Sequence, residues 1–213
     1  MKNSNDDKLI QLLEDMSGMN DISGSKGSET LSWSAYRIAE NVNDLSLVDE
    51  LLDFIENTEN ITLHEEGYQL LIFIFKNTKN DELLDKLLGS LKKEEHNDES
   101  LYRLLIGIWE SDKEITNYVE DIIYFITDDR ALIRNAAIRI LGNCSLDKDL
   151  AEEALKEVVK SPYDEHDLKY SIESLGKIGD KETISFLKDF NPEVSTETIN
   201  KEIINAIIAL ENK

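Results

Sequence analysis

The chain has 213 residues, 40% of them hydrophobic, with only two prolines and nine glycines, so it can bury a sizeable helical core and is not a disordered chain. Its 45 acidic side chains exceed its 23 basic ones and give a formal net charge of -22. Because this charge repels phosphate groups and attracts basic protein surfaces, we expect a basic protein partner and no nucleic-acid partner.

The first thirty residues are predicted to form a capping helix and a loop. Residues 1–16 contain an amphipathic helical pattern over 5–16, which is typical of a helix that caps the open end of a stack. They lack the apolar core and cleavage site of a secretory signal, and no later segment reaches membrane-spanning length, so we expect a cytoplasmic protein with no membrane contact. Residues 17–30 contain three glycines and four serines, which predicts a flexible loop or linker and a candidate binding loop.

From residue 31 onward, one helical motif returns at spacings of 34, 34, 35, 34 and 32 residues. The anchors of this motif are Ile38, Ile72, Ile106, Leu141, Leu175 and Ile207. Around each anchor the sequence predicts a helix, a short polar turn and a second amphipathic helix. Such hairpins bury their apolar faces only against neighbouring hairpins. We therefore expect residues 31–213 to form a single all-α repeat domain of about five helical hairpins with terminal helices.

Two segments carry a more specific signature. Residues 133–144 combine Ile-Arg, paired alanines and Leu-Gly, and residues 167–180 end in Leu-Gly-Lys-Ile-Gly-Asp. Both resemble the first helix of short HEAT repeats of the phycobilin-lyase type, whose pattern is roughly V-R-x-x-A-A-x-A-L-G-x-I-G-D. The earlier repeats keep the period without the signature, because Phe73 follows the anchor Ile72, and Tyr68 and Tyr102 stand at a usually small position.

The resemblance implies a right-handed α-α superhelix, a HEAT-like or armadillo-like solenoid in which the second helix of each repeat lines the concave surface. The expected second helices lie near 45–57, 81–93, 114–127, 150–160 and 181–190. Cys144 falls in an apolar helical pattern and has no second cysteine to pair with, so we expect a small buried hydrophobic residue at this position.

Acidic residues on the second helices are the candidate partner-binding residues. In the first repeat, Asp49, Asp53 and Glu56 share the face opposite the apolar stripe. Repeat 29–60 has one basic and eight acidic residues, and repeat 98–128 has two and eight. A tyrosine among carboxylates in the third repeat suggests a recognition anchor. The complete candidate set is Asp49, Asp53, Glu56, Asp85, Glu114, Asp121, Tyr124 and Glu157.

The alternative interpretation is that these carboxylates are ordinary solvated side chains that keep the protein soluble. One observation opposes this interpretation. Asp49 and Asp53 repel each other at i and i+4, which costs about 0.2–0.5 kcal/mol, and the local sequence shows no contact that compensates for this cost.

The sequence lacks the motifs of common enzymes. His64, His96 and His166 are about a repeat or more apart, outside any His-x-x-x-His arrangement, and we expect all three on the surface without a metal. Neither a phosphate-binding loop nor a nucleophile elbow is present. We therefore expect no enzyme, no catalytic residues and no cofactor. Three arginines form the only tight basic cluster, and we expect them to neutralise carboxylates between stacked repeats. They are Arg130, Arg134 and Arg139.

Three functions are compatible with these features. The first is a non-enzymatic, monomeric scaffold whose acidic concave surface binds a basic protein; resemblance to small acidic HEAT-like proteins implies one concrete form, an immunity protein that covers the phosphate-binding surface of a nuclease toxin. The second is an enzyme on the same architecture, related to HEAT-like DNA glycosylases or to phycobilin lyases. The third is a regulatory adaptor, which differs from an immunity protein mainly in its biological context.

Overall fold

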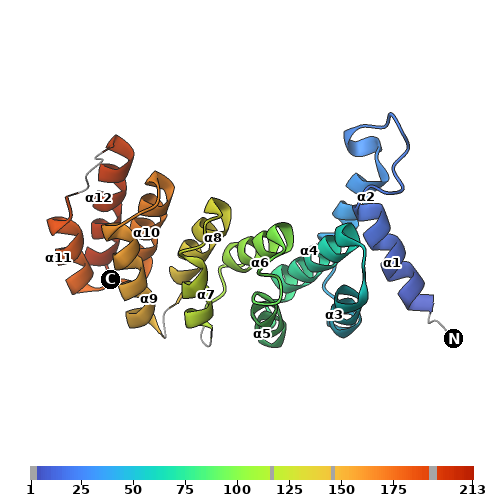
Figure 1. Ribbon diagram of the computed structural model, residues 1–213, viewed down its shortest axis with the longest axis horizontal. Helices are drawn as coiled ribbons and strands as arrows, with labels where there is room; N and C mark the ends of the chain where they lie inside the picture. The colour runs from blue at the N-terminus through green and yellow to red at the C-terminus, as the bar shows by residue number, and fades with distance from the viewer. Residues whose placement is uncertain (1–3, 116–117, 145–146, 192–195) are drawn as a thin grey trace. The chain divides into compact units, whose positions relative to one another are not determined.

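The chain folds entirely into helices and connecting loops over the part that the structure, a computed structural model, describes (Figure 1). The described residues are 4–115, 118–144, 147–191 and 196–213. No strand occurs among them, so the predicted all-α class is confirmed. The chain divides into two compact units, residues 1–111 (unit 1) and residues 112–213 (unit 2), and each is described by itself. The handedness of a superhelix stays a prediction.

Unit 1 contains six α-helices and two short 3-10 helices among its described residues. The helices are α1 Ser4–Met16, η1 Gly27–Glu29, α2 Leu31–Ala39, η2 Leu45–Leu47, α3 Val48–Asn57, α4 Ile61–Thr78, α5 Asp81–Ser90 and α6 Asp98–Glu110. The predicted capping helix corresponds to α1, which packs on α2 and α4. The predicted second helices of the first two repeats correspond to α3 and α5.

The described residues of unit 2 also form six α-helices. They are α7 Val119–Phe125, α8 Ala131–Leu141, α9 Lys148–Lys160, α10 Glu165–Ile178, α11 Lys181–Asp189 and α12 Glu197–Glu211. The predicted second helices of the last two full repeats correspond to α9 and α11. The prediction for the third repeat was wrong at its start, because α7 begins at Val119 rather than at residue 114.

Side-chain caps at the start of many helices explain where the chain turns into each repeat. Asn60 and Asn97 accept hydrogen bonds from backbone N–H groups at the starts of α4 and α6, at 3.2 Å in both cases. Asp164 and Thr196 do the same for α10 and α12. These side chains satisfy N–H groups that have no partner within the helix. Caps of this kind therefore begin most of the first helices, although α8, whose N-cap is Arg130, starts without one.

The first helices of successive repeats pack on one another: α4 on α6, α8 on α10, and α10 on α12. Glycine makes the closest approaches possible. A Cβ atom on Gly142 would lie 3.1 Å from the Cα of Ser174, and one on Gly176 would lie 2.9 Å from the Cα of Ala206. The Leu-Gly pairs of the sequence signature thus mark places where two helix backbones nearly touch.

The buried core follows most of the predicted apolar stripes. The anchors Ile72, Leu141 and Leu175 are buried, and so is Cys144, whereas the first anchor, Ile38, is exposed. Burial raises the pKa of the Cys144 thiol to about 12, with smaller contributions from nearby carboxylates. The prediction of a small buried hydrophobic residue at this position is confirmed.

Candidate functional site

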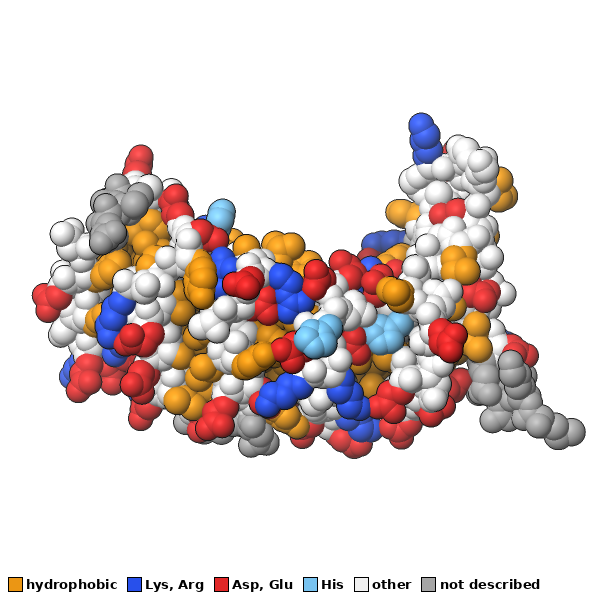
Figure 2. Space-filling model, in the orientation of Figure 1, with side chains coloured by type: hydrophobic (Ala, Val, Ile, Leu, Met, Phe, Trp, Pro, Cys, Tyr) orange, Lys and Arg blue, Asp and Glu red, His pale blue; other side chains and the backbone are white. Residues whose placement is uncertain are grey.

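Exposed carboxylates of α3 and α5 form one acidic surface in unit 1, which we call the α3/α5 acidic face. It consists of Asp49, Asp53, Glu56, Glu82 and Asp85. Figure 2 shows red carboxylates with interspersed blue side chains along the lower edge of the molecule, where α3 and α5 lie in Figure 1. Four of the candidate residues from the sequence thus lie on the two predicted helices, with their side chains in solvent.

Two lysines partly neutralise this face. The Nζ atom of Lys86 lies 2.8 Å from Asp49 and 3.1 Å from Glu82, and that of Lys93 lies 2.5 Å from Glu56. The ion pair with Lys86 therefore offsets the repulsion between Asp49 and Asp53, contrary to the expectation that nothing compensates for it. The Asp49 side chain is nevertheless 86% exposed, and exposed ion pairs contribute only about 0–1 kcal/mol. A partner's cations can replace these lysines at small cost.

A groove between α1 and α3 adjoins the acidic face, and we call it the α1–α3 groove. Its volume is about 330 Å³. It is lined by Leu9, Ile10, Glu50, Asp53, Phe54, Asn57 and Thr58. The groove is therefore apolar on the side of α1 and Phe54, and polar along the rest of α3. Asp53 belongs both to the groove and to the acidic face.

The other four candidate residues lie in unit 2. Asp121 and Tyr124 are on α7, and Glu157 is on α9, where Lys160 approaches it to 2.5 Å. Tyr124 is 53% exposed and makes an edge contact with the Phe125 ring at 5.1 Å between centroids. Glu114 lies in the loop before α7, so its placement on a second helix was wrong.

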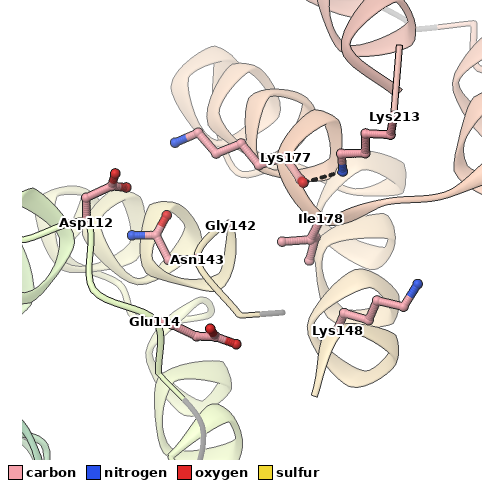
Figure 3. Close-up of a pocket in the computed structure, with 8 residues that line it drawn as sticks. All are labelled: Asp112, Glu114, Gly142, Asn143, Lys148, Lys177, Ile178 and Lys213. Carbon is pink, nitrogen blue, oxygen red and sulfur yellow. Dashed lines mark hydrogen bonds between the residues drawn. The ribbon is translucent and has the colours of Figure 1, made fainter. Parts of the chain in front are cut away.

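Glu114 instead lines a cleft of about 300 Å³ within unit 2 (Figure 3). The cleft is lined by Asp112, Glu114, Gly142, Asn143, Lys148, Lys177, Ile178 and Lys213. Three lysines suggest an anion site, but Figure 3 shows the amino groups of Lys148 and Lys177 pointing away from each other. The Nζ atom of Lys213 donates to the backbone carbonyl of Lys177. Because the ammonium groups do not converge, we assign no anion to this cleft.

A buried polar cluster in unit 1 contains His64, contrary to the prediction that all three histidines lie on the surface. The His64 side chain is only 17% exposed. Its Nδ1 atom lies 3.1 Å from the Ser100 hydroxyl, and its Nε2 atom lies 3.3 Å from Glu94. The Tyr68 hydroxyl donates to the same carboxylate oxygen at 3.0 Å. The hydrogen-bonded partners are 26 to 36 residues apart, which is about one repeat. This separation is the feature of the sequence from which the cluster could have been found.

Serine, histidine and glutamate in series resemble a hydrolytic triad, but the surroundings do not fit one. Ser100 is fully buried, and it sits in the first turn of α6. A nucleophile must reach its substrate as well as its base. We therefore interpret the cluster as a structural tie between α4, α6 and the turn before α6.

The arginine cluster also serves the structure. Arg134, which is 4% exposed, donates from Nε to Asp167 at 2.8 Å and from Nη2 to Asp164 at 3.1 Å, joining α8 to the start of α10. Arg130 pairs with Asp128 at 2.7 Å. The guanidinium carbon of Arg139 lies 3.7 Å from the Tyr170 ring centroid. The prediction that the arginines neutralise carboxylates between stacked repeats is confirmed for Arg134, whereas Arg130 pairs with a carboxylate of its own loop.

Neither a metal centre nor a membrane-spanning helix occurs in the described part of the chain. Its residues contain no group of three or more His, Cys, Asp or Glu side chains arranged to hold a metal ion. Among the same residues, every helix is too short or too polar to cross a bilayer.

Comparisons with known proteins inform the fold alone. No protein-family model matches the chain, and neither does any curated protein. Two crystal structures of engineered all-helical proteins from the Northeast Structural Genomics Consortium are similar to it, both at 16% identity. One has a TM-score of 0.54 and covers 99% of this chain and 98% of its own. The other has a TM-score of 0.51 and covers 99% of this chain and 59% of its own. These similarities show a helical repeat-like fold.

Proposed function

We propose that this protein is a non-enzymatic binding scaffold, a HEAT-like solenoid that binds a basic protein through the α3/α5 acidic face. The observation that carries the proposal is the coincidence of exposed carboxylates with an adjoining half-apolar groove that shares Asp53. Apolar contacts supply affinity, and surrounding charges supply specificity and fast association.

The charge of unit 1 supports a basic partner. Its 10 basic and 23 acidic side chains give residues 1–111 a net charge of -13. A field of this sign increases the rate of encounter with a cationic surface by about 10- to 1000-fold at low salt. In a HEAT-like solenoid α3 and α5 would line the concave surface, which is part of the proposal. We further propose an immunity protein as its concrete form, with a basic nuclease toxin as the partner.

The enzymatic alternatives gain less support. A DNA glycosylase on this architecture needs a basic groove for the duplex, and two of the three clustered arginines, Arg130 and Arg134, are engaged by carboxylates. For a phycobilin lyase relative, no observation in the described residues points to a tetrapyrrole site.

The test is affinity capture from the source cells with the native chain and two matched variants. The first variant changes Asp49, Asp53, Glu56 and Asp85 to Asn or Gln. The control variant makes the same number of neutral substitutions at exposed positions in unit 2, namely Glu153, Glu182, Asp189 and Glu197. Circular dichroism establishes that both variants fold.

We expect the native chain and the control to capture one basic protein, in a manner that weakens as salt rises, and the first variant to lose it. Equal capture by all three chains would refute a role of the α3/α5 acidic face. An immunity role additionally requires that the captured protein be a nuclease whose activity the native chain inhibits. A captured protein without such activity would favour the regulatory adaptor.

A further inference from the structure

The α1–α3 groove differs from the rest of the α3/α5 acidic face in its cations. Asp49 and Glu56 each have a lysine within 2.8 Å, whereas no lysine or arginine lines the groove. The Asp53 carboxylate instead accepts a hydrogen bond from the Asn57 amide at 3.2 Å, and the structure gives it no basic partner among the described residues. Of the three exposed carboxylates of α3, which are Asp49, Asp53 and Glu56, Asp53 is therefore the one with no lysine beside it among the described residues.

The groove also offers an apolar contact beside that carboxylate. Among the residues that line it, Leu9 is buried, and Ile10 and Phe54 are half-exposed. A volume of about 330 Å³ lies at the small end of the range for ligand pockets, so the groove suits a side chain or two rather than a large cofactor. An apolar anchor surrounded by charged contacts is the arrangement that dominates binding energy at many protein interfaces.

We propose that the α1–α3 groove receives a large apolar side chain from an amphipathic segment of the basic partner, with a neighbouring lysine or arginine of that segment paired to Asp53. This inference rests on the proposed function and specifies the contact that gives it affinity. Charge selects the occupant: a second copy of this chain would bring a further net charge of -22 to a unit that carries -13. A basic segment is attracted by the same field.

The probes are three labelled synthetic peptides of equal length. The first is a helix of lysines on one face and leucines on the other. In the second every leucine is replaced by serine, which keeps the charge. In the third every lysine is replaced by glutamate. Binding to the full chain is measured by fluorescence anisotropy at two salt concentrations. We expect the leucine–lysine peptide to bind at least tenfold more tightly than the serine–lysine peptide, and the acidic peptide not to bind.

Two variants and a matched control assign this binding to the groove. Asp53→Asn removes the carboxylate of the groove, and Asn57→Trp fills the groove while keeping its charge. Asp85→Asn makes the same charge change as Asp53→Asn on the exposed face of α5, away from the groove. Thermal unfolding shows whether each chain is folded. We expect Asp53→Asn to weaken the leucine–lysine peptide about fivefold more than Asp85→Asn does, and Asn57→Trp to abolish the preference for leucine over serine.

The groove proposal is overturned if the leucine and serine peptides bind equally, or if Asp53→Asn and Asp85→Asn have the same effect. The proposed function fails separately. The four-fold neutral variant is the chain in which Asp49, Asp53, Glu56 and Asp85 are all changed to Asn or Gln. If this variant loses the natural partner while the Asn57→Trp chain captures it undiminished, the acidic face binds the partner and the groove does not. If the four-fold neutral variant also captures the partner undiminished, the proposed function itself is wrong.

Discussion

Helices one repeat apart are joined differently in the two units. In unit 2, α10 and α12 meet through small residues, and Gly176 lies against the backbone of Ala206. In unit 1, α4 and α6 meet through a large side chain, because the anchor Ile72 fills the space in front of Gly107. The same period of about 34 residues thus tolerates two kinds of contact. The Leu-Gly signature of residues 133–144 and 167–180 occurs in unit 2, where the small-residue contact is found.

The buried polar ties differ in the same way. Unit 2 uses a charged pair, with Arg134 on α8 bound to the fully buried Asp167 on α10. Unit 1 adds tyrosine hydroxyls to its polar contacts: Tyr36 donates at 2.6 Å to the buried Glu66, which Arg103 also approaches to 3.4 Å, and Tyr68 donates to Glu94. Burial, together with the neighbouring Glu66, raises the pKa of Tyr36 to about 12. A tyrosine at a position that is usually small therefore brings its own hydrogen-bond donor into the interface.

Breaking the charged tie of unit 2 should have the largest effect. Arg134→Ala leaves Asp167 buried without its cation, and losing one partner of a buried pair costs about 3–5 kcal/mol. Hydrogen exchange measured by mass spectrometry should show lost protection in α8 and α10, with unit 1 unchanged. The double variant Arg134→Met with Asp167→Leu should regain most of the stability, since the other partner of Arg134, Asp164, is 37% exposed and no buried charge remains unpaired. Equal losses in the single and double variants would contradict this account.

The close approach in unit 2 gives the next effect. A methyl group on Gly176 meets the backbone of Ala206, which cannot rotate away, so Gly176→Ala should destabilise the protein by about 1–3 kcal/mol. Gly89, on α5, provides the matched control because a Cβ atom added there would meet nothing within 4 Å. Gly89→Ala should stabilise its helix by about 0.5–1 kcal/mol. Both values are measured by urea denaturation. A neutral Gly176→Ala would show that α10 and α12 separate easily.

The local sequence pattern determines most of the fold but not every helix boundary. The period of the anchors and the apolar stripes predicted the all-α class and most second helices, because both depend on local pattern. Ile115 shows the limit. It continues the helical spacing toward Val119 and Ile122 and is fully buried, yet it lies in the loop before α7. Periodicity cannot distinguish a buried loop residue from the first turn of a helix.

The candidate site was predictable in part. The amphipathic pattern of α3 correctly predicted that Asp49, Asp53 and Glu56 lie in solvent. The apolar stripe of the helix faces the core, so charged residues on the opposite face point outward. The pairing of Asp49 with Lys86 spans 37 residues and depends on how α3 and α5 align. The α1–α3 groove depends on where α1 docks, and α1 lies outside the repeat. Neither feature is encoded in local spacing.

The hydroxyl ties of unit 1 should be weaker than the charged tie of unit 2. Tyr68→Phe removes one donor from Glu94, which keeps His64 as a partner, so we expect a loss of about 1 kcal/mol. Tyr163→Phe is the control, since this residue is 61% exposed and its ring contact with Arg134 survives the change. Thermal unfolding of the two variants gives the comparison. A loss as large as that of Arg134→Ala would mean that the two kinds of tie are equivalent.

The smallest expected effect is the pH dependence of stability that comes from two aspartates near Arg134, and its direction is opposite for the two. Hydrogen bonds from Arg130 hold the pKa of Asp128 below its ordinary value of 3.8. Its stabilisation is therefore present above pH 3.8 and lost as the pH falls through the lower folded-state pKa. Burial raises the pKa of Asp167, so the folded state holds that proton more tightly than the unfolded state, and stability from this group falls as the pH rises.

Stability measured from about pH 2 to about pH 7 for Asp128→Asn and Asp167→Asn separates the two contributions. The difference between native chain and variant should grow with pH for Asp128→Asn, because the native carboxylate gains its stabilising charge. For Asp167→Asn the proton-linked part of that difference should run the opposite way, because burial penalises the charge that the asparagine never carries. Parallel pH profiles for the two variants would show that Arg134 compensates the burial of Asp167 completely, and that the charged tie of unit 2 carries no net desolvation penalty.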